Sequence, residues 1–342
     1  MRRYQGEPLP EGCRVAVISN DALGNYVVAT PLIQMLRREL KPSSLHYYGG
    51  TRTEELWVHD PDIDWGYPFF GSDPGHAVLN YGVETEGEVY DLVVNLEEHP
   101  WAKSFAAVIG WQGAVVGPCL GIDGRGDLPQ ADDAVGRLAA DPKWVAEDLV
   151  HRYPFLESGW ISEIFSRLAY LKGPVPPYRI VRHDPGTKVP EVLIATAASL
   201  GNKLWPVEKW REVLRWLHAE DASVGLLGAK PADQRKFWKG DSMEDVLVEE
   251  GLVEDLRGKL SLTQVAGALE AADAVLTIDN GILHLACATP TQVVGLFRHG
   301  IHRLWAPPVP NVRVLTPGEG REVADISVEA VKEALACALT AC

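Results

Sequence analysis

The sequence predicts an α/β protein made of two doubly wound domains, and three observations support this prediction. Short apolar stretches rich in β-branched residues alternate with segments of helical spacing along both halves of the chain. A proline-rich stretch over 173–190 interrupts the alternation. The 342 residues fit two domains of about 100–200 residues each. We therefore expect an N-terminal domain over 1–175 and a C-terminal domain over 176–342, whose last helix could pack back on the N-terminal domain.

The N-terminal domain is expected to begin with a buried parallel strand over 13–19, because this segment is short, apolar and β-branched. A turn follows over 19–25, and apolar residues at helical spacing predict a helix over 26–40. The other elements expected here are strands at 45–48 and 91–96 and a mainly helical segment over 143–172.

The C-terminal domain repeats the alternation more regularly. The expected strands lie at 191–196, 223–227, 246–248, 274–278 and 293–297. The expected helices lie at 206–219, 231–238, 262–271, 281–288 and 328–339. Pro206 suits the first position of a helix, where no N–H is needed. Ser261 is placed to cap the helix that follows it.

The composition limits the partners of this chain. Lys and Arg number 32 and Asp and Glu 47, a net charge of −15, which disfavours binding to nucleic acid. No apolar run reaches the about 18 residues of a membrane span, so we expect at most peripheral membrane contact. The basic start lacks the apolar stretch of a signal peptide. The five cysteines are scattered without a Cys-x-x-Cys pair, and we expect reduced thiols in a cytoplasmic protein.

Several common site motifs are missing. The loop after the first strand holds a single glycine, which argues against an NAD- or FAD-dependent oxidoreductase. The sequence contains neither a P-loop motif nor the G-x-S-x-G motif of α/β-hydrolases. The acids of Asp60-Pro-Asp-Ile-Asp64 and the pair His299 and His302 could suggest metal binding. Ordinary solvated side chains explain both better, so we expect no metal site.

The sharpest local feature is Thr277-Ile-Asp-Asn-Gly-Ile-Leu-His-Leu-Ala286, in which a strand ends and Asp-Asn-Gly opens a helix. Free backbone amides and the positive helix end would then lie at the carboxyl edge of a sheet, where anions bind. Gly281 permits close approach of a phosphate. The alternative is structural: Asp279 caps the helix and His284 is buried in it.

A second loop, Ala197-Ala-Ser-Leu-Gly-Asn-Lys-Leu-Trp-Pro206, carries one lysine between a strand and a helix. Lys203 could neutralise a diphosphate held by the first loop, whereas the alternative is a solvated surface lysine. Together the two loops favour a nucleotide diphosphate ligand.

These segments carry a resemblance to the heptosyltransferase-type glycosyltransferases of family 9. The matching segments are Leu23-Gly-Asn-Tyr-Val-Val-Ala-Thr-Pro-Leu with the strand before it, Asn202-Lys-Leu-Trp-Pro-Val-Glu-Lys-Trp, Leu227-Gly-Ala, and Asp279-Asn-Gly-Ile-Leu-His-Leu-Ala. The resemblance implies a GT-B fold, with two Rossmann-like domains facing a central cleft. It also implies inverting transfer from ADP-heptose with no metal and no cofactor.

The resemblance implies that the C-terminal domain holds the nucleotide sugar. Lys203 falls at the diphosphate contact, and Asn280, Gly281 and Ile282 fall where backbone amides meet phosphate. The other implied donor-binding residues are Ser199 at a phosphate or ribose, Asp233 at the ribose, Leu260 at the adenine, and Asp279 and His284 of the family pattern Asp-x-Gly-x-x-His.

One departure concerns catalysis. The family motif reads Leu-Gly-Asp, with the Asp as general base, but this chain has Leu23, Gly24 and Asn25, and an amide cannot take a proton near neutral pH. Asp21 in the same loop could replace it, or could be an ordinary loop carboxylate.

We therefore expect an ADP-sugar-dependent glycosyltransferase that acts on an acceptor hydroxyl or amine. The alternative is a catalytically decayed nucleotide-sugar-binding protein, which Asn25 favours. The acceptor is either the lipopolysaccharide core or a soluble small molecule, and the net charge of −15 argues against a heavily phosphorylated one.

Overall fold

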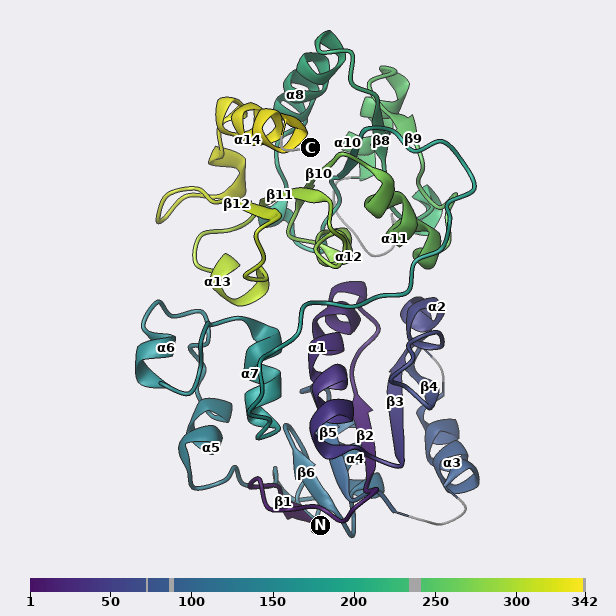
Figure 1. Cartoon of the computed structure of the whole chain (residues 1–342), viewed down its shortest axis with the longest axis vertical. Coiled ribbons are helices and arrows are strands. Elements are labelled where there is room, and N and C mark those ends of the chain that lie inside the picture. Colours follow the sequence, from purple (N-terminus) through teal and green to yellow (C-terminus); the bar gives the residue numbers. More distant parts are fainter. Residues whose placement is uncertain (72, 86–88, 234–240, 341–342) are drawn as a thin grey trace. The chain divides into compact units, whose positions relative to one another are not determined.

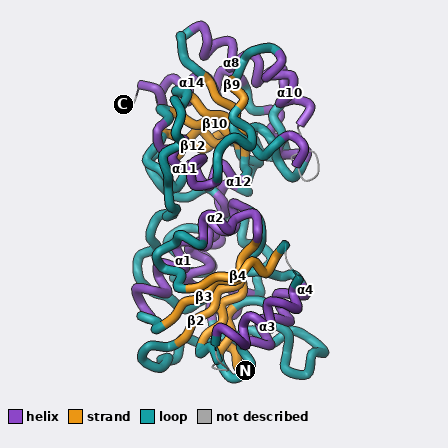
Figure 2. The backbone as a smooth tube through the Cα atoms, turned by 90° about the vertical axis from the view of Figure 1, so that its right-hand side faces the viewer, coloured by secondary structure: helices purple, strands orange, loops and turns teal. Residues whose placement is uncertain are grey.

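A computed structural model describes residues 1–71, 73–85, 89–233 and 241–340 of the chain. These residues form two compact units, Met1–Arg179 and Ile180–Cys342 (Figure 1). The boundary lies inside the proline-rich stretch that the sequence indicated. In each unit helices flank a sheet of parallel strands, drawn in orange in Figure 2. The predicted fold class of doubly wound α/β architecture is confirmed.

The described part of the first unit contains a six-stranded parallel sheet in the order β1-β6-β5-β2-β3-β4. Its strands are β1 (Arg2–Arg3), β2 (Arg14–Ile18), β3 (Ser44–Gly50), β4 (Trp65–Phe70), β5 (Leu92–Asn95) and β6 (Ala114–Val116). Its helices are α1 (Leu23–Leu40), α2 (Glu54–Trp57), α3 (Pro74–Glu84), α4 (Pro100–Ile109), α5 (Ala134–Ala139), α6 (Leu149–Arg152) and α7 (Ile161–Leu168).

The strand order of this sheet reverses between β2 and β5. The chain runs outward from β2 through β3 to β4, and then returns to the other side of β2 with β5 and β6. In open α/β sheets, ligands bind outside the carboxyl ends of the strands at such a switch point. The loops after β2 and β5 therefore form the candidate site of the first unit.

Helix α1 begins at Leu23, three positions before the predicted start at 26. Its interior Pro31 cannot donate the usual hydrogen bond to Val27, and the Thr30 hydroxyl donates to that carbonyl instead, at 2.8 Å. The predicted turn over 19–25 is therefore shorter, and the Leu-Gly-Asn motif forms the first helical turn. The segment 143–172, predicted to be mainly helical, holds two short helices, α6 and α7, with loops around them.

In the second unit the described residues form another six-stranded parallel sheet, in the order β12-β11-β10-β7-β8-β9. Its strands are β7 (Val192–Ala195), β8 (Val224–Leu226), β9 (Glu254–Asp255), β10 (Ala274–Ile278), β11 (Gln292–Leu296) and β12 (Val312–Leu315). Its helices are α8 (Val207–Ala219), α10 (Asp241–Glu249), α11 (Leu262–Ala271), α12 (Gly281–Ala286), α13 (His302–Trp305) and α14 (Val328–Thr340). The switch point here lies between β7 and β10.

One predicted strand of this unit is wrong. Residues 246–248 belong to α10, and the strand that pairs with β8 is β9. Leu247 of α10 is buried in the core of the unit and Met243 packs against the same core, a helical spacing of four. A run of three apolar residues is too short to separate helix from strand by periodicity. The predicted helix over 231–238 lies largely outside the described residues.

One of the two helix signals of this unit is confirmed. Ser261 caps α11, and its hydroxyl accepts a hydrogen bond from the Gln264 backbone while the Gln264 side chain accepts one from Ser261. Pro206, predicted to be the first helical residue, is instead the N-cap residue before α8, which begins at Val207. The last helix, α14, packs against α8, β10 and β11 of its own unit and buries Val331 and Leu335. No described helix is long and apolar enough to cross a bilayer.

Candidate functional site

The second unit brings two predicted loops together at its switch point. The loop after β7 carries Lys203, at the end of a single 3₁₀ turn (Gly201–Lys203), and the loop after β10 carries Asp279. Because β7 and β10 are parallel neighbours, both loops leave the same edge of the sheet. The two loops therefore lie at the same edge of the sheet, as the sequence predicts.

Lys203 and Asp279 form an ion pair at this edge. The Lys203 ammonium lies 2.8 Å from Asp279 Oδ2 and donates to the Asp279 carbonyl oxygen at 3.2 Å. The side chains are 16% and 6% exposed, so Lys203 is not the solvated surface lysine of the alternative reading. An ammonium has three N–H donors, and these two contacts leave the third for a ligand oxygen.

Asn280 organises the start of α12. Its side-chain oxygen accepts from the Leu283 backbone amide at 3.1 Å, and its side-chain nitrogen donates to the Ala197 carbonyl at 3.1 Å. The helix cap is therefore Asn280, and the alternative in which Asp279 caps the helix is wrong. Helix geometry gives the amides of Gly281 and Ile282 no acceptor within α12, so they suit an anion.

His284 lies one turn inside α12 and is buried, as the structural reading of this motif predicts. Burial lowers the pKa of His284 to about 4, with the charge of Lys203 adding to that shift and the charge of Asp279 opposing it. The ring packs edge-on against Trp305, 5.8 Å between centroids. His284 is therefore neutral near physiological pH and packs inside the unit.

The other predicted donor residues lie on segments that follow strands at the same edge. Ser199 is exposed in the loop after β7, Asp233 is exposed in the segment after β8, and Leu260 is half-buried after β9. The Gly258 amide donates to the Gly228 carbonyl at 2.9 Å, which ties the last two of these loops together. Strand order β10-β7-β8-β9 thus spreads the predicted diphosphate, ribose and adenine contacts along one edge.

The first unit places an unpredicted carboxylate at its switch point. Glu97 follows β5 by two residues, and its Oε1 accepts from the Asn20 side-chain amide at 2.7 Å. The Asn25 side chain also stabilises the ionised form of the Glu97 carboxyl. Asn95 fixes the Glu97 backbone, since it accepts from the Glu97 amide at 3.0 Å and donates to the Glu97 carbonyl at 2.9 Å.

The ionisation of Glu97 is displaced towards neutral pH. Burial raises its pKa to about 7, the hydrogen bonds from Asn20 and Asn25 oppose this shift, and the charge of Glu98 adds to it. A carboxyl group with this pKa exchanges a proton near physiological pH. Sequence reasoning missed Glu97 because 72 positions separate it from Asn25, and strand pairing alone makes them neighbours. The signal available was an acid directly after a buried strand.

Asp21 has a different environment. One of its carboxylate oxygens accepts from the Arg52 backbone amide at 2.8 Å, and the other lies 2.5 Å from the Arg52 guanidinium. Leu23, Gly24 and Asn25 are half-buried in the first turn of α1. All four residues lie in or beside the loop after β2. The roles assigned to Asp21 and to this motif stay predictions.

The acids of the 60–64 segment are structural. Asp60 and Asp62 lie 2.8 and 2.5 Å from the Arg179 guanidinium, and Tyr26 donates to Asp60 at 3.0 Å. The Asp64 carboxylate accepts from the Leu45 amide at 2.7 Å. Within the described ranges, no group of three or more His, Cys, Asp or Glu side chains is arranged to hold a metal ion.

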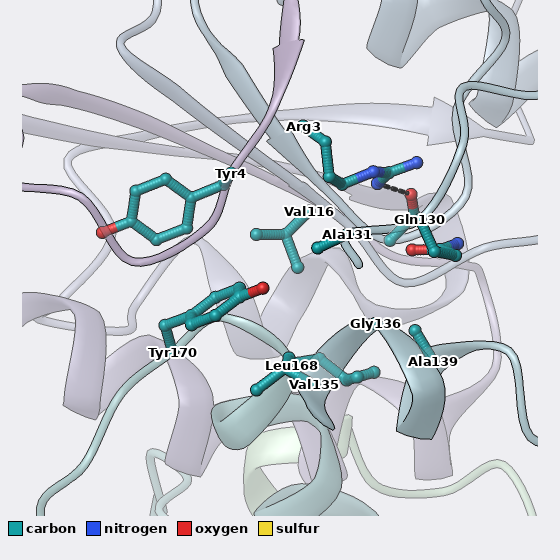
Figure 3. A pocket seen from close by; sticks show the side chains of 11 residues that line it. Arg3, Tyr4, Val116, Gln130, Ala131, Val135, Gly136, Ala139, Leu168 and Tyr170 are labelled. Atoms are coloured by element: carbon teal, nitrogen blue, oxygen red, sulfur yellow. Dashed lines mark hydrogen bonds between the residues drawn. The ribbon is translucent and has the colours of Figure 1, made fainter. Parts of the chain in front are cut away.

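A small cavity lies elsewhere in the first unit, at the ends of β1 and β6 (Figure 3). It has a volume of about 20 Å³, which is room for about one water molecule. The Arg3 guanidinium beside it donates to the carbonyls of Leu128 and Pro129, and the Tyr170 hydroxyl donates to Asp133 at 2.7 Å. Its polar groups are engaged by the protein, so this cavity is not a ligand site.

Comparison with known proteins gives a family match for part of the chain. Residues 176–329 match the model of glycosyltransferase family 9 (heptosyltransferase), a segment that contains every predicted donor residue. No curated protein matches the sequence.

Solved structures resemble nearly the whole chain. A glycosyl transferase family 9 protein from Veillonella parvula has a TM-score of 0.69 at 14% identity, with 97% of this chain and 98% of that chain covered. The E. coli ADP-heptose lipopolysaccharide heptosyltransferase II has a TM-score of 0.68 at 18% identity, covering 95% and 98%. E. coli heptosyltransferase WaaC with ADP gives 0.65 at 17% identity, covering 95% and 99%. These likenesses show the GT-B fold.

Proposed function

Because the chain is a glycosyltransferase that carries a family 9 domain over residues 176–329, we propose that it transfers heptose from ADP-heptose to an acceptor. The observation that supports this most directly is the ion pair between the half-buried Lys203 and the buried Asp279, beside the start of α12 at the β7/β10 switch point. Solved structures of similar fold hold ADP and ADP-2-deoxy-2-fluoro heptose.

The donor diphosphate would be held by charge and by amides. The third N–H of the Lys203 ammonium and the amides of Gly281 and Ile282 donate to its oxygens. Asp279 fixes the position of Lys203 through the 2.8 Å ion pair, and Ser199 adds a hydroxyl donor from the neighbouring loop. These donors stabilise the negative charge that grows on ADP as its bond to the sugar breaks.

The nucleoside would extend along the sheet edge. Asp233, after β8, is a ribose ligand in this proposal, because a carboxylate accepts from both ribose hydroxyls. Leu260, after β9, offers an apolar contact to adenine. The acceptor then attacks the anomeric carbon from the face opposite ADP, which inverts its configuration. Lys203 and the α12 amides supply the charge stabilisation without a metal ion.

The acceptor is proposed to be a sugar or a small molecule carrying few phosphates. A net charge of −15 would repel a heavily phosphorylated acceptor and an anionic membrane surface. A neutral inner-core sugar and a soluble metabolite are both compatible with this charge, and the proposed site of action is the cytoplasm.

The test of the donor site is calorimetric titration of ADP and ADP-heptose into Lys203→Ala. Loss of a hydrogen bond between charged groups weakens binding by about 1.5–3 kcal/mol, which is roughly 10–150-fold. The matched control is Lys332→Ala, which removes a surface lysine paired with Glu212 on α8. Unchanged ADP affinity in Lys203→Ala would exclude the proposed donor site.

Transfer itself is tested by incubating the protein with ADP-, GDP- and UDP-sugars and measuring release of the nucleotide. ADP release that exceeds the Lys203→Ala background supports a transferase. ADP binding without any release, with every acceptor and with water, would support the decayed binding protein that Asn25 favours.

A further inference from the structure

We infer that Glu97 is the group that takes the proton from the acceptor hydroxyl, held in place for this task by Asn20 and Asn25. The inference rests on the proposed transfer reaction and names a catalytic residue of it. It starts from the chemical problem that Asn25 creates: a side-chain amide donates hydrogen bonds but does not accept a proton near neutral pH.

The hydrogen bonds around Asn20 orient its side chain. Asn20 Oδ1 accepts from the Ala22 backbone amide at 2.8 Å, so its NH₂ group is the end that faces Glu97 at 2.7 Å. The Asn25 amide also stabilises the ionised form of the Glu97 carboxyl. A carboxylate has about four lone-pair sites, so the Asn20 bond leaves room for an acceptor hydroxyl. The two asparagines thus position a base instead of acting as one.

The neighbouring carboxylates are engaged by cations. Glu98, beside Glu97 in the chain, lies 2.8 Å from the Lys103 ammonium of α4. Asp21 lies 2.5 Å from the Arg52 guanidinium. Both carboxylates are therefore already paired with a cation of the protein. The contacts described for the Glu97 side chain are to amides.

Burial also suits Glu97 to proton exchange near neutral pH. It raises the pKa of Glu97 to about 7, and the charge of Glu98 acts in the same direction. The other titratable group that faces Glu97 is Tyr47 of β3; burial raises the pKa of its hydroxyl well above neutral pH, so it stays uncharged. A base whose pKa lies near the working pH combines ionisation with basicity.

The position of Glu97 also explains how Asn25 can be tolerated. Asn25 lies in the first turn after β2, and Glu97 lies in the loop after β5, the parallel neighbour of β2 at the switch point. The carboxylate that the family motif carries at the position of Asn25 is thus replaced by one in the loop after the adjacent strand. Asn25 itself stabilises the ionised form of that replacement.

The proposed transfer step forms one bond, breaks one bond and moves one proton. The acceptor oxygen forms a bond to the anomeric carbon, and its proton moves to a Glu97 carboxylate oxygen. The bond between the anomeric carbon and the diphosphate oxygen breaks, and ADP leaves with that electron pair. Glu97 then releases the proton to solvent before the next turnover.

The experiment measures ADP release from ADP-heptose, with an acceptor that receives the sugar or with water. It compares Glu97→Gln with Glu98→Gln, which changes the exposed neighbouring residue in the same way. We expect kcat to fall about 10²–10⁴-fold in Glu97→Gln, the usual contribution of a general base, with ADP affinity unchanged. Wild-type kcat/KM should rise with pH through about 7, and Glu97→Gln should lack this limb. Glu98→Gln should keep both the rate and the limb.

Retention of the rate and of the acid limb by Glu97→Gln would overturn the inference, as would Asp21→Asn removing that limb in its place. A second measurement needs no turnover: a carbon-13 NMR titration of the Glu97 carboxyl in the free protein. A midpoint near 7 supports the inference, and a midpoint below 5 overturns it. Unchanged ADP affinity in Lys203→Ala is a separate result, which contradicts the donor site instead.

Discussion

Asn25 and Glu97 together show how the residue at one position affects the ionisation of a neighbouring carboxyl group. The amide of Asn25 stabilises the ionised form of a half-buried carboxylate, and burial still holds the pKa of that carboxylate at about 7. A carboxylate at position 25 would place a second negative charge beside Glu97. Two neighbouring like charges disfavour simultaneous ionisation, so one proton would be shared between them.

This leads to a prediction for Asn25→Asp. The shared proton raises the folded-state pKa of the pair above 7, while the unfolded acids titrate near about 4. An acid whose pKa is raised by folding loses stability as pH increases between those two values. The melting temperature of Asn25→Asp should therefore equal that of wild type at pH 4 and fall below it at pH 8.

Asn80→Asp is the control, because Asn80 lies in α3 and its side chain donates to the His76 carbonyl, away from Glu97. An equal melting-temperature difference at both pH values for Asn25→Asp would contradict contact between residue 25 and Glu97.

At the scale of elements, the donor site depends on a short helix that cannot form alone. Helix α12 has six residues, and isolated helices of that length are unstable in water. Asn280 stabilises it through the cap to Leu283 and joins it to the β7 loop through the Ala197 carbonyl. The same side chain therefore maintains both the helix start and the distance between the two phosphate loops.

Asn280→Ala should accordingly change two quantities together. Loss of the cap destabilises the protein by about 1 kcal/mol, measured by urea unfolding. ADP affinity should also fall, measured by calorimetry, because the amides of Gly281 and Ile282 lose their orientation. Asp73→Ala is the matched control: Asp73 caps α3 through the Gly75 amide at 2.8 Å, so stability should fall without a change in ADP affinity.

At the scale of the molecule, the chain consists of two units, each with its own sheet and hydrophobic core. The predicted donor residues all belong to Ile180–Cys342, and Asn20, Asn25 and Glu97 belong to Met1–Arg179. A ligand stabilises the part of a protein that binds it, by about 2.7 kcal/mol at 100 times its Kd. A donor ligand alone should therefore stabilise the second unit and leave the first unit unchanged.

We expect ADP alone to slow amide hydrogen exchange in the loops after β7 and β10, and to leave the loops after β2 and β5 unchanged. Mass spectrometry of peptides with and without saturating ADP measures this difference. Lys203→Ala at the same ADP concentration is the control, since it should lose the protection. Protection confined to the first unit would contradict the assignment of the donor site.

The sequence by itself determined the α/β class, most elements of the second sheet and the residues around Lys203 and Asp279. These features depend on local patterns, such as alternating apolar strands, the Ser261 cap and a polar loop that opens a helix. The predicted strand at 246–248 failed because three apolar residues fit a helix equally well, and packing of Leu247 against the core decided between them.

The tertiary structure alone decided which loops meet. Glu97 and Asn25 are 72 positions apart, and the pairing of β5 with β2 brings their segments to the same edge of the sheet. The ion pair between Lys203 and Asp279 requires the pairing of β7 with β10 in the same way. Strand order depends on how helices pack across the whole sheet, which no local segment encodes. Burial, which raises the pKa of Glu97 to about 7, is likewise a property of the folded chain.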